Sequence, residues 1–361
     1  MDADESPTTG LVNISTESPL FQFEDYTQRV LVASSILIIS ILGTLGNSLV
    51  ILAVSSSRKL RTDTNVFVVN LSVADLLTSL VIPWHAVALL SKDHLPVPHV
   101  VCGVVAVVIF TAVGSSMYTL ASIALNRLLL ITRPNTTYLK IYTPKKIAAW
   151  LALTWFVPFI AIISPIIGDL GSVGYNGQLH FCGQDRLHRN QHKYDIIIAL
   201  ALYPIPLTTI TVCYLFIWKY LRQHERRMAV APRETEGSSD ESRAVASRSL
   251  ATMDNPPPVR PRQRIRRQNE ITKNMFYIVC AFMLCTTPYA ICLFITESDA
   301  LKPYAATIVL MNSCINPLIY ATKHRDFKIV FRCILRCKWG NIPESSDCLK
   351  TVGQLLCGRA G

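Results

Sequence analysis

The run Val30–Val54 reads VLVASSILIISILGTLGNSLVILAV and contains no charged residue. A helix needs about 20 consecutive apolar residues to cross the hydrocarbon core of a bilayer, and this run is long enough to do so. Six further apolar runs follow along the chain, at Asn65–Leu90, Val100–Ile131, Ile147–Gly168, Tyr194–Leu221, Asn269–Ile295 and Tyr304–Thr322. We therefore expect an all-α membrane protein built as a bundle of seven transmembrane helices.

The composition of the 361 residues agrees with a membrane protein. Half of them are apolar and only 16% are charged, whereas a soluble domain usually has about 25% charged residues. The net charge of +11 does not indicate a nucleic-acid partner, because most of the excess lies in short loops between apolar runs. Residues 1–28 are polar and acidic and lack the features of a secretory signal. The first span is therefore expected to act as its own targeting signal.

The distribution of Lys and Arg predicts the orientation. The loops after the first and third spans and the long stretch between spans five and six are basic and fall on one side, which should be cytosolic. We expect a multi-pass protein of the plasma membrane with an extracellular tail at 1–29, a seven-helix domain at 30–322 and a cytoplasmic helix and tail at 323–361. Residues 222–268 are expected to form a disordered third cytoplasmic loop. Asn13 begins an N-x-S sequon in the outer tail and is a glycosylation candidate.

A short amphipathic helix is expected after the seventh span. Phe327, Val330, Phe331, Ile334 and Leu335 would share one face, with basic residues on the other. This pattern is typical of a helix that lies at the membrane interface and contacts lipid. Cys333 or Cys337 could be palmitoylated there, and a plain reduced thiol is the alternative for each.

An ordered set of motifs lies inside the spans. In chain order they are Gly46-Asn47, Asn70–Asp75, Asn126-Arg127, Trp155, Pro206 with Tyr214, Cys285–Pro288 and Asn316–Tyr320. Their order and spacing over 30–337 resemble the rhodopsin-like (class A) G-protein-coupled receptors. The stretch around Asn126-Arg127 is similar to the Moody-type orphan receptors and to the melatonin receptors. That similarity implies a heterotrimeric G protein, of the inhibitory type, as partner.

The resemblance implies an activation switch at the cytosolic side. It assigns to this switch Asn126, Arg127, Tyr214, Phe282, Pro288, Asn316, Pro317 and Tyr320. In the family the arginine is restrained in the inactive state and contacts the G protein after activation. Asn126 replaces the usual acid, Leu128 the usual Tyr and Thr286 the usual Trp. We therefore expect a weak restraint on Arg127 and measurable basal signalling.

Asp75 is a carboxylate at mid-membrane depth, which is costly and points to function. The resemblance implies a sodium ion bound by Asp75, Asn47, Ser116, Asn312 and Ser313, and oxygen ligands suit such a hard cation. The ion would be an allosteric ligand that favours the inactive state. The alternative is a structural aspartate hydrogen-bonded to water. No other cofactor is expected.

The residues expected to face the ligand are mostly apolar. Ile109 replaces the Asp of amine receptors and Leu310 replaces the Schiff-base Lys of opsins, so the resemblance argues against both groups. The candidates are His85, Ile109, Phe110, Val113, Ile198, Leu202, Thr286, Tyr289, Leu293 and Ala306. Such a chamber suits a neutral or lipid-like small molecule. Interhelical packing of these side chains, a satisfied core histidine at His85 and a peptide ligand at the basic residues 186–193 are the alternatives.

Two cysteines are expected to pair on the outer side. Cys102 opens the third span and Cys182 is the only cysteine in the loop between spans four and five. That compartment is oxidising and offers no other candidate. Two free thiols are the alternative.

Other functional classes fit the sequence less well. We find no nucleophile, base and metal set for an enzyme, and the spans hold too few polar residues for a channel or transporter. Arrestin and receptor kinases would be further partners, acting at Ser238, Ser239, Ser242, Ser345 or Ser346. Because of Asn126, Leu128 and Thr286, a non-signalling decoy or scaffold of the same fold is the main alternative to a signalling receptor.

Overall fold

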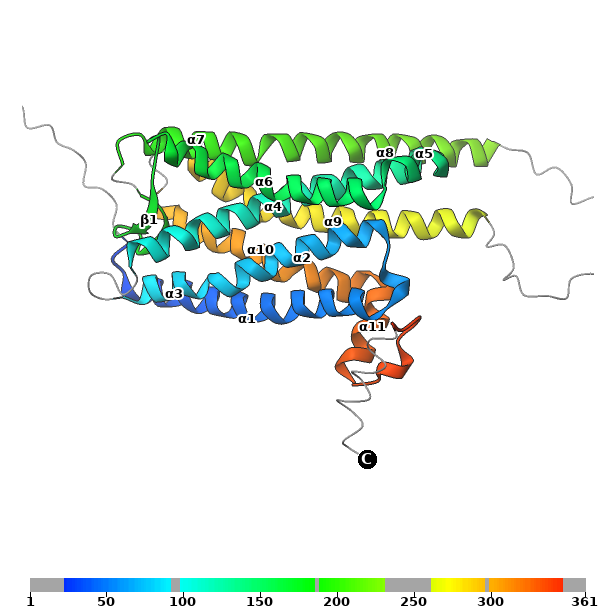
Figure 1. Ribbon diagram of the computed structural model, residues 1–361, viewed down its shortest axis with the longest axis horizontal. Coiled ribbons are helices and arrows are strands. Elements are labelled where there is room, and N and C mark those ends of the chain that lie inside the picture. Colours follow the sequence, from blue (N-terminus) through cyan, green and yellow to red (C-terminus); the bar gives the residue numbers. More distant parts are fainter. Residues whose placement is uncertain (1–22, 92–97, 186–187, 231–260, 296–298, 347–361) are drawn as a thin grey trace, which may run out of the picture.

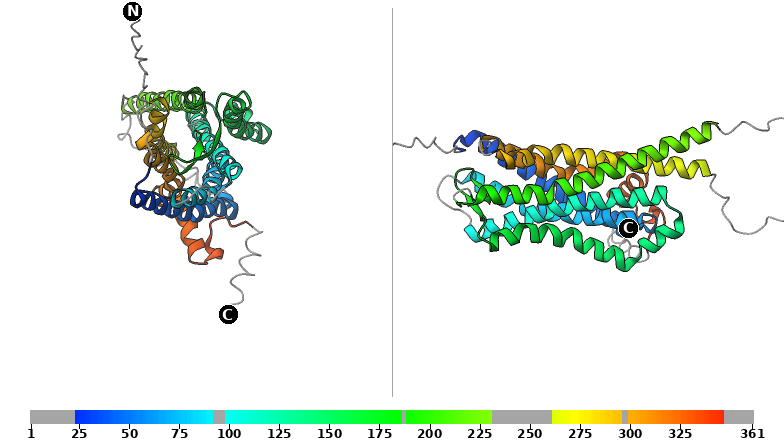
Figure 2. Two further views of the ribbon diagram at one scale, coloured as in Figure 1. Left: turned by 90° about the vertical axis from the view of Figure 1, so that its left-hand side faces the viewer. Right: turned by 90° about the horizontal axis from the view of Figure 1, so that it is seen from above.

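The computed structural model describes residues 23–91, 98–185, 188–230, 261–295 and 299–346. In this part of the chain seven helical segments are long and apolar enough to cross a membrane, and each coincides with one predicted span. The segments run side by side along the long axis of the molecule (Figure 1). Viewed along that axis they are arranged around a common interior (Figure 2). The predicted seven-helix bundle is confirmed.

The helices follow one another along the chain as follows. The first three spans are α1 (Tyr26–Ser56), α2 (Asp63–Val81) with α3 (Pro83–Leu90), and α4 (His99–Thr132). The fourth and fifth are α6 (Pro144–Ile167) and α7 (Gln191–Leu202) with α8 (Pro204–Val230). The last two are α9 (Pro261–Phe294) and α10 (Lys302–Lys323). Short helices complete the chain: η1 (Arg58–Leu60), α5 (Asn135–Ile141), η2 (Asp299–Leu301), α11 (Arg325–Leu335) and η3 (Trp339–Asn341).

The outside of the bundle is apolar. Leu45, Leu215 and Leu284 are 66, 59 and 75% exposed, which suits contact with lipid tails rather than water. Inside, small residues let helices approach closely, as membrane bundles require. A Cβ added at Gly114 of α4 would lie 2.7 Å from the Pro158 ring of α6. The bundle therefore places its apolar surface outside and close packing inside.

A β hairpin covers one end of the bundle, here called the hairpin end (Figure 1). Strands β1 (Val173–Asn176) and β2 (Phe181–Gln184) are antiparallel, and Asn176 is opposite Phe181. The Asn176 side chain accepts from the backbone N–H groups of Gln178 and Leu179 at 3.0 and 3.2 Å, which stabilises the turn. A disulfide joins Cys182 of β2 to Cys102 of α4. The predicted pairing is confirmed, whereas the hairpin itself was not predicted.

Helix α11 and the segment after it lie at the opposite end of the bundle (Figure 1). Phe327, Val330, Phe331 and Ile334 are buried, and the Phe327 ring stacks on Tyr320 of α10 at 5.2 Å. Leu335 is 72% exposed. The predicted amphipathic helix is therefore present, and the protein itself covers most of its apolar face.

The segment after α11 turns back to the end of α1. Ser345 forms a β-bridge with Ser57, and the Ser346 N–H donates to the Ser56 carbonyl at 2.9 Å. A salt bridge of 3.1 Å between Lys59 and Asp326 adds to this contact. We call residues 342–346 the tail strap.

Several predicted boundaries need correction. Helix α1 begins within the predicted tail, because Asp25 caps it and Arg29 is buried against the backbone of Leu89. Helices α8 and α9 both continue into the predicted loop 222–268. Helix α8 can do so because the first proline after span five is Pro232. Helix α9 begins at Pro261, because proline is favourable at the first position of a helix. Asn13 and the candidate serines Ser238, Ser239 and Ser242 lie outside the described residues.

Candidate functional site: an apolar chamber and a polar interior

A cavity lies under the hairpin, between α3, α4, α9 and α10. Its lining is made by His85, Ala106, Ile109, Phe110, Val113, Phe181, Cys182, Tyr289, Ala306, Val309 and Leu310. Six of the ten residues predicted to face a ligand are in this set. The lining is almost entirely apolar, and the disulfide fixes its roof to α4. We call this cavity the chamber.

Four predicted ligand residues do not line the chamber. Ile198 and Leu202 pack with Ile162 and Tyr194 in a cluster between α6 and α7. Phe110, which lines the chamber, also packs against this cluster. Leu293 is buried elsewhere, and the Thr286 hydroxyl donates to the Phe282 carbonyl of its own helix at 2.9 Å. The spacing on a helix could not distinguish faces that pack on a neighbour from faces that meet a cavity.

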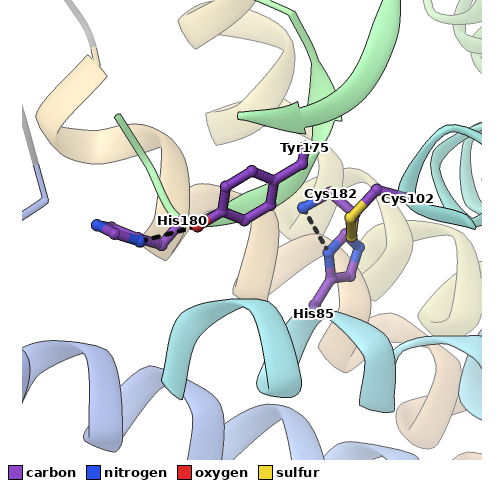
Figure 3. Close-up of a disulfide and its surroundings, with 5 residues drawn as sticks. All are labelled: His85, Cys102, Tyr175, His180 and Cys182. Atoms are coloured by element: carbon purple, nitrogen blue, oxygen red, sulfur yellow. Dashed lines mark hydrogen bonds between the residues drawn. A yellow bond between two sulfur atoms is a disulfide. The ribbon is translucent and has the colours of Figure 1, made fainter. Parts of the chain in front are cut away.

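His85 holds the roof of the chamber in place (Figure 3). The N–H of Cys182 donates to His85 Nδ1 at 3.3 Å. The imidazole also stacks on Phe181, with ring centroids 3.8 Å apart and an interplanar angle of 8°. In a neutral ring that accepts at Nδ1, the proton is on Nε2. His85 therefore has the structural role of a satisfied core histidine, which was the alternative interpretation, and it also lines the chamber.

A second histidine lies in the hairpin. The Tyr175 hydroxyl and His180 Nδ1 are 3.1 Å apart (Figure 3). Burial lowers the pKa of His180 below its ordinary value of 6.5, and the positive charge of Arg29 acts in the same direction. The neutral ring is therefore the form that the folded hairpin favours.

A smaller pocket adjoins the chamber and is here called the mouth. The two share Phe181, Tyr289 and Ala306, and the mouth is also lined by Asn176, Leu179, Gly183, Gln184, Lys302 and Pro303. The Tyr289 hydroxyl donates to Gln184 Oε1 at 3.0 Å. Phe181 and Gln184 were not predicted to line a cavity, although Asn176-Gly177 is a strong hairpin signal and places both residues on a strand.

Asp75 is at the centre of a polar interior further down the bundle. Asn316 Nδ2 donates to Asp75 Oδ2 at 2.8 Å, and the Ser116 hydroxyl donates to Asp75 Oδ1 at 3.3 Å. These contacts join α2, α4 and α10. Asn47 of α1 donates instead to the Ser313 carbonyl, at 2.7 Å. The structure thus brings Asp75 and Ser116 together and adds Asn316, which was predicted for the switch rather than for a sodium site.

The polar interior has the chemistry that a sodium ion needs. The Oδ1 atoms of Asn47, Asn312 and Asn316 are buried and have no hydrogen-bond partner among the described residues. Buried oxygens of this kind are usually satisfied by a partner or by something bound. Together with the Asp75 carboxylate these are oxygen groups of the kind that a hard cation binds. The residues present therefore fit the predicted ion.

Asn126 and Arg127 are buried where α4 approaches the end opposite the hairpin. The Thr64 hydroxyl donates to Asn126 Oδ1 at 2.7 Å, and Asn126 Nδ2 donates to the Tyr138 hydroxyl at 2.9 Å. Tyr138 in turn donates to Asp63 at 3.4 Å. Asn126 therefore ties α4 to α2 and α5 through neutral hydrogen bonds.

Two other switch candidates have unsatisfied groups in this state. The buried hydroxyls of Tyr214 and Tyr320 have no hydrogen-bond partner among the described residues. Another polar contact of α9 involves the hydroxyls of Tyr203 and Thr287, which are 2.5 Å apart. This contact joins the break between α7 and α8 to the turn of α9 before Pro288. Helix α9 thus has an internal proline, a residue at which helices commonly kink, next to a polar contact with the α7–α8 break.

Comparison with known proteins identifies the family. Residues 46–320 match the model of the 7 transmembrane receptor (rhodopsin family). The chain belongs to the rhodopsin family of seven-transmembrane receptors. The alpha-1D adrenergic receptor of Mus musculus is 30% identical over 315 residues, which are 81% of this chain and 55% of that receptor. The G-protein coupled receptor moody of Drosophila melanogaster is 23% identical, with 90 and 54% covered.

The solved structure of squid rhodopsin has the same fold. Its TM-score is 0.68 at 22% identity, with 86% of this chain and 87% of that chain covered. The chain spans about half the length of the curated relatives it matches.

Within the rhodopsin family this receptor departs from the usual pattern at Asn126, Leu128 and Thr286. The structure gives a physical account of Asn126 and Thr286. The amide of Asn126 both accepts and donates, which a carboxylate could not do. The small side chain of Thr286 bonds only within α9.

Proposed function

We propose that this receptor binds a neutral or lipid-like small molecule in the chamber and activates a heterotrimeric G protein. The chamber carries the proposal, because it is apolar and roofed by a disulfide-anchored strand. Three of the helices that line it, α4, α9 and α10, continue to the opposite end of the bundle. Buried apolar cavities with few polar groups suit such ligands. The basic loops predict the orientation of the receptor in the plasma membrane. The hairpin then lies on the extracellular side, and α5 and α11 lie on the cytosolic side.

The proposed mechanism is a shift between two states. A ligand that contacts α4, α9 and α10 changes their relative positions only if it binds one state more tightly. The helix-internal Pro288 and the unsatisfied hydroxyls of Tyr214 and Tyr320 support a second arrangement of α9. Arg127 would then meet the G protein, and a sodium ion at Asp75 would favour the resting state. Arrestin and receptor kinases would act afterwards.

Ligand-free activation of each G-protein family in cells tests this proposal. We expect basal activation, led by the inhibitory type, that falls at least several-fold in Arg127→Ala. Asp75→Asn should remove the inhibition of basal activity by sodium in isolated membranes. If no G protein responds at equal surface expression, a non-signalling decoy or scaffold becomes the better account.

A further inference from the structure

The residues that precede and begin α1 reach across the hairpin end of the bundle (Figure 1). We call residues 23–28 the latch. The Phe23 N–H donates to the Gln178 carbonyl in the hairpin turn at 2.8 Å. The Phe23 ring meets the ring of Tyr304 in α10 edge-on, with centroids 5.9 Å apart and an interplanar angle of 86°. The latch therefore joins the hairpin to α10, two elements that are distant in the sequence.

The latch is held by one buried side chain and two hydrogen bonds. Phe23 is 2% exposed, although it lies outside the helices and strands. Burial of an aromatic side chain is favourable and offsets the entropy lost when a chain segment is ordered. The Tyr304 hydroxyl adds a hydrogen bond to Gln28 Oε1 at 2.6 Å. These contacts are few enough to break locally while the bundle stays folded.

The start of α1 is fixed independently of Phe23. Asp25 Oδ1 accepts from the N–H of Thr27 at 2.9 Å and so caps the helix. Arg29 is buried, and its Nε donates to the Leu89 carbonyl of α3 at 2.7 Å. Phe23 can therefore leave its site by a local swing at the capped helix start, without moving α1.

The two elements that the latch joins are two sides of the mouth. Asn176 and Leu179 line the mouth on the hairpin, and Gln178, to which the latch is bonded, lies between them. Pro303 lines the mouth on α10, and Tyr304 is the next residue. The latch thus ties together the two walls between which a molecule would pass from the hairpin end to the chamber.

We propose that the latch gates the mouth, so that docked Phe23 closes the passage to the chamber and its release opens it. This inference rests on the proposed ligand chamber and adds the control of access to it. A gate of this kind slows entry and exit alike, so it sets the rates of ligand binding more than the affinity.

The accessibility of a thiol in the mouth tests the inference without a ligand or a G protein. Ala306→Cys places the thiol where the mouth and the chamber meet. The purified, full-length receptor in lipid nanodiscs is treated with a positively charged methanethiosulfonate reagent. Modification at position 306 is followed with time by mass spectrometry. We expect it to be slow, and at least tenfold faster when Phe23→Ala is added, because the rate follows the fraction of open latch.

Further variants show whether the effect belongs to the latch. Tyr304→Ala removes the partner of Phe23 from the opposite wall and should accelerate modification to a similar extent. The two substitutions together should be little faster than either alone, because both open the same contact. Thr27→Ala changes an exposed side chain of the latch and should leave the rate unchanged. The native Cys213 thiol, buried within the bundle, should remain unmodified in every variant.

An unchanged rate at position 306 in the Phe23→Ala protein would overturn the inference. Equal acceleration at Cys213 would also overturn it, because the bundle as a whole would then be loosened. Nucleotide exchange by a receptor whose rate at position 306 ignores Phe23 would contradict the latch alone. A gated mouth in a receptor that activates no G protein would support the latch and contradict the proposed signalling.

Discussion

The hydrogen-bond partners of Asn126 differ from those expected at this position of the activation switch. It bonds to Thr64 and Tyr138 rather than supplying a carboxylate next to Arg127. Asn126→Asp would place a negative charge beside the buried guanidinium and stabilise the restrained state. We expect basal nucleotide exchange to fall roughly fivefold, the effect of about 1 kcal/mol on a two-state equilibrium.

The control for this variant is Thr64→Val, which removes one hydrogen bond at Asn126 without adding charge. Basal exchange in Thr64→Val should not fall. Unchanged or increased exchange in Asn126→Asp would show that position 126 does not set the restraint on Arg127.

His180 gives the hairpin a dependence on pH. Its pKa is lowered in the folded protein, so the unfolded chain binds the proton more readily. The contribution of the neutral ring is complete above pH 6.5 and is lost as the pH falls below that value. We expect the unfolding midpoint of the purified receptor to fall less on acidification in His180→Gln than in the unaltered protein. Parallel pH profiles of the two proteins would contradict this.

At the scale of elements, the tail strap holds the end of α1. Ser346 is buried, and its hydroxyl donates to the Ser55 carbonyl at 3.2 Å. Ser346→Glu places a charge in that site, and the strap should detach at a cost of about 1–3 kcal/mol. We expect a lower unfolding midpoint and faster proteolysis after α11.

Ser345→Glu is the matched control, because Ser345 is only half-buried and a charge there can stay near water. Its effect should be smaller. Equal stability of the Ser346→Glu protein and the unaltered one would mean that the strap is not docked. The same burial makes Ser346 a poor kinase target while the strap is docked. Cys337 is exposed whereas Cys333 is only partly exposed, so Cys337 is the better palmitoylation candidate.

The elements differ in how well the sequence predicted them. The spans were predicted because about 20 apolar residues have few other stable arrangements. The ends of α8 and α9 were not, because polar helix-forming residues such as Arg222 and Gln268 give no hydropathy signal. The strands were missed as well, since four-residue segments bury too little to stand out.

The candidate site was predicted in part for a physical reason. His85, Ile109 and Tyr289 could be placed from motif positions within helices, and all three line the chamber. Ile198 and Leu202 were also predicted to face the ligand but pack in a separate cluster, because helical spacing does not reveal which neighbour a helix face meets. The mouth depends on the contact of β2 with α9 and α10, which only the folded chain brings about.

At the scale of the whole molecule, two sites lie at different depths of one bundle. Helix α4 carries Ile109 of the chamber, Ser116 of the polar interior and Arg127 near the opposite end. Helix α9 carries Tyr289 of the chamber and, next to it in sequence, the helix-internal Pro288. A displacement of α4 or α9 by a ligand in the chamber can therefore be transmitted to the end opposite the hairpin by the helices themselves, without passing through loops.

The central claim is that this bundle activates a G protein through Arg127. The most direct measurement is nucleotide exchange on a purified inhibitory-type G protein by the purified receptor in lipid vesicles. We expect exchange above that of empty vesicles, falling at least several-fold in Arg127→Ala and unchanged in Arg133→Ala, which alters the exposed end of the same helix. Exchange equal to empty vesicles with every G-protein family, from receptor that is folded and stable, would contradict the claim and leave a decoy or scaffold built on this fold.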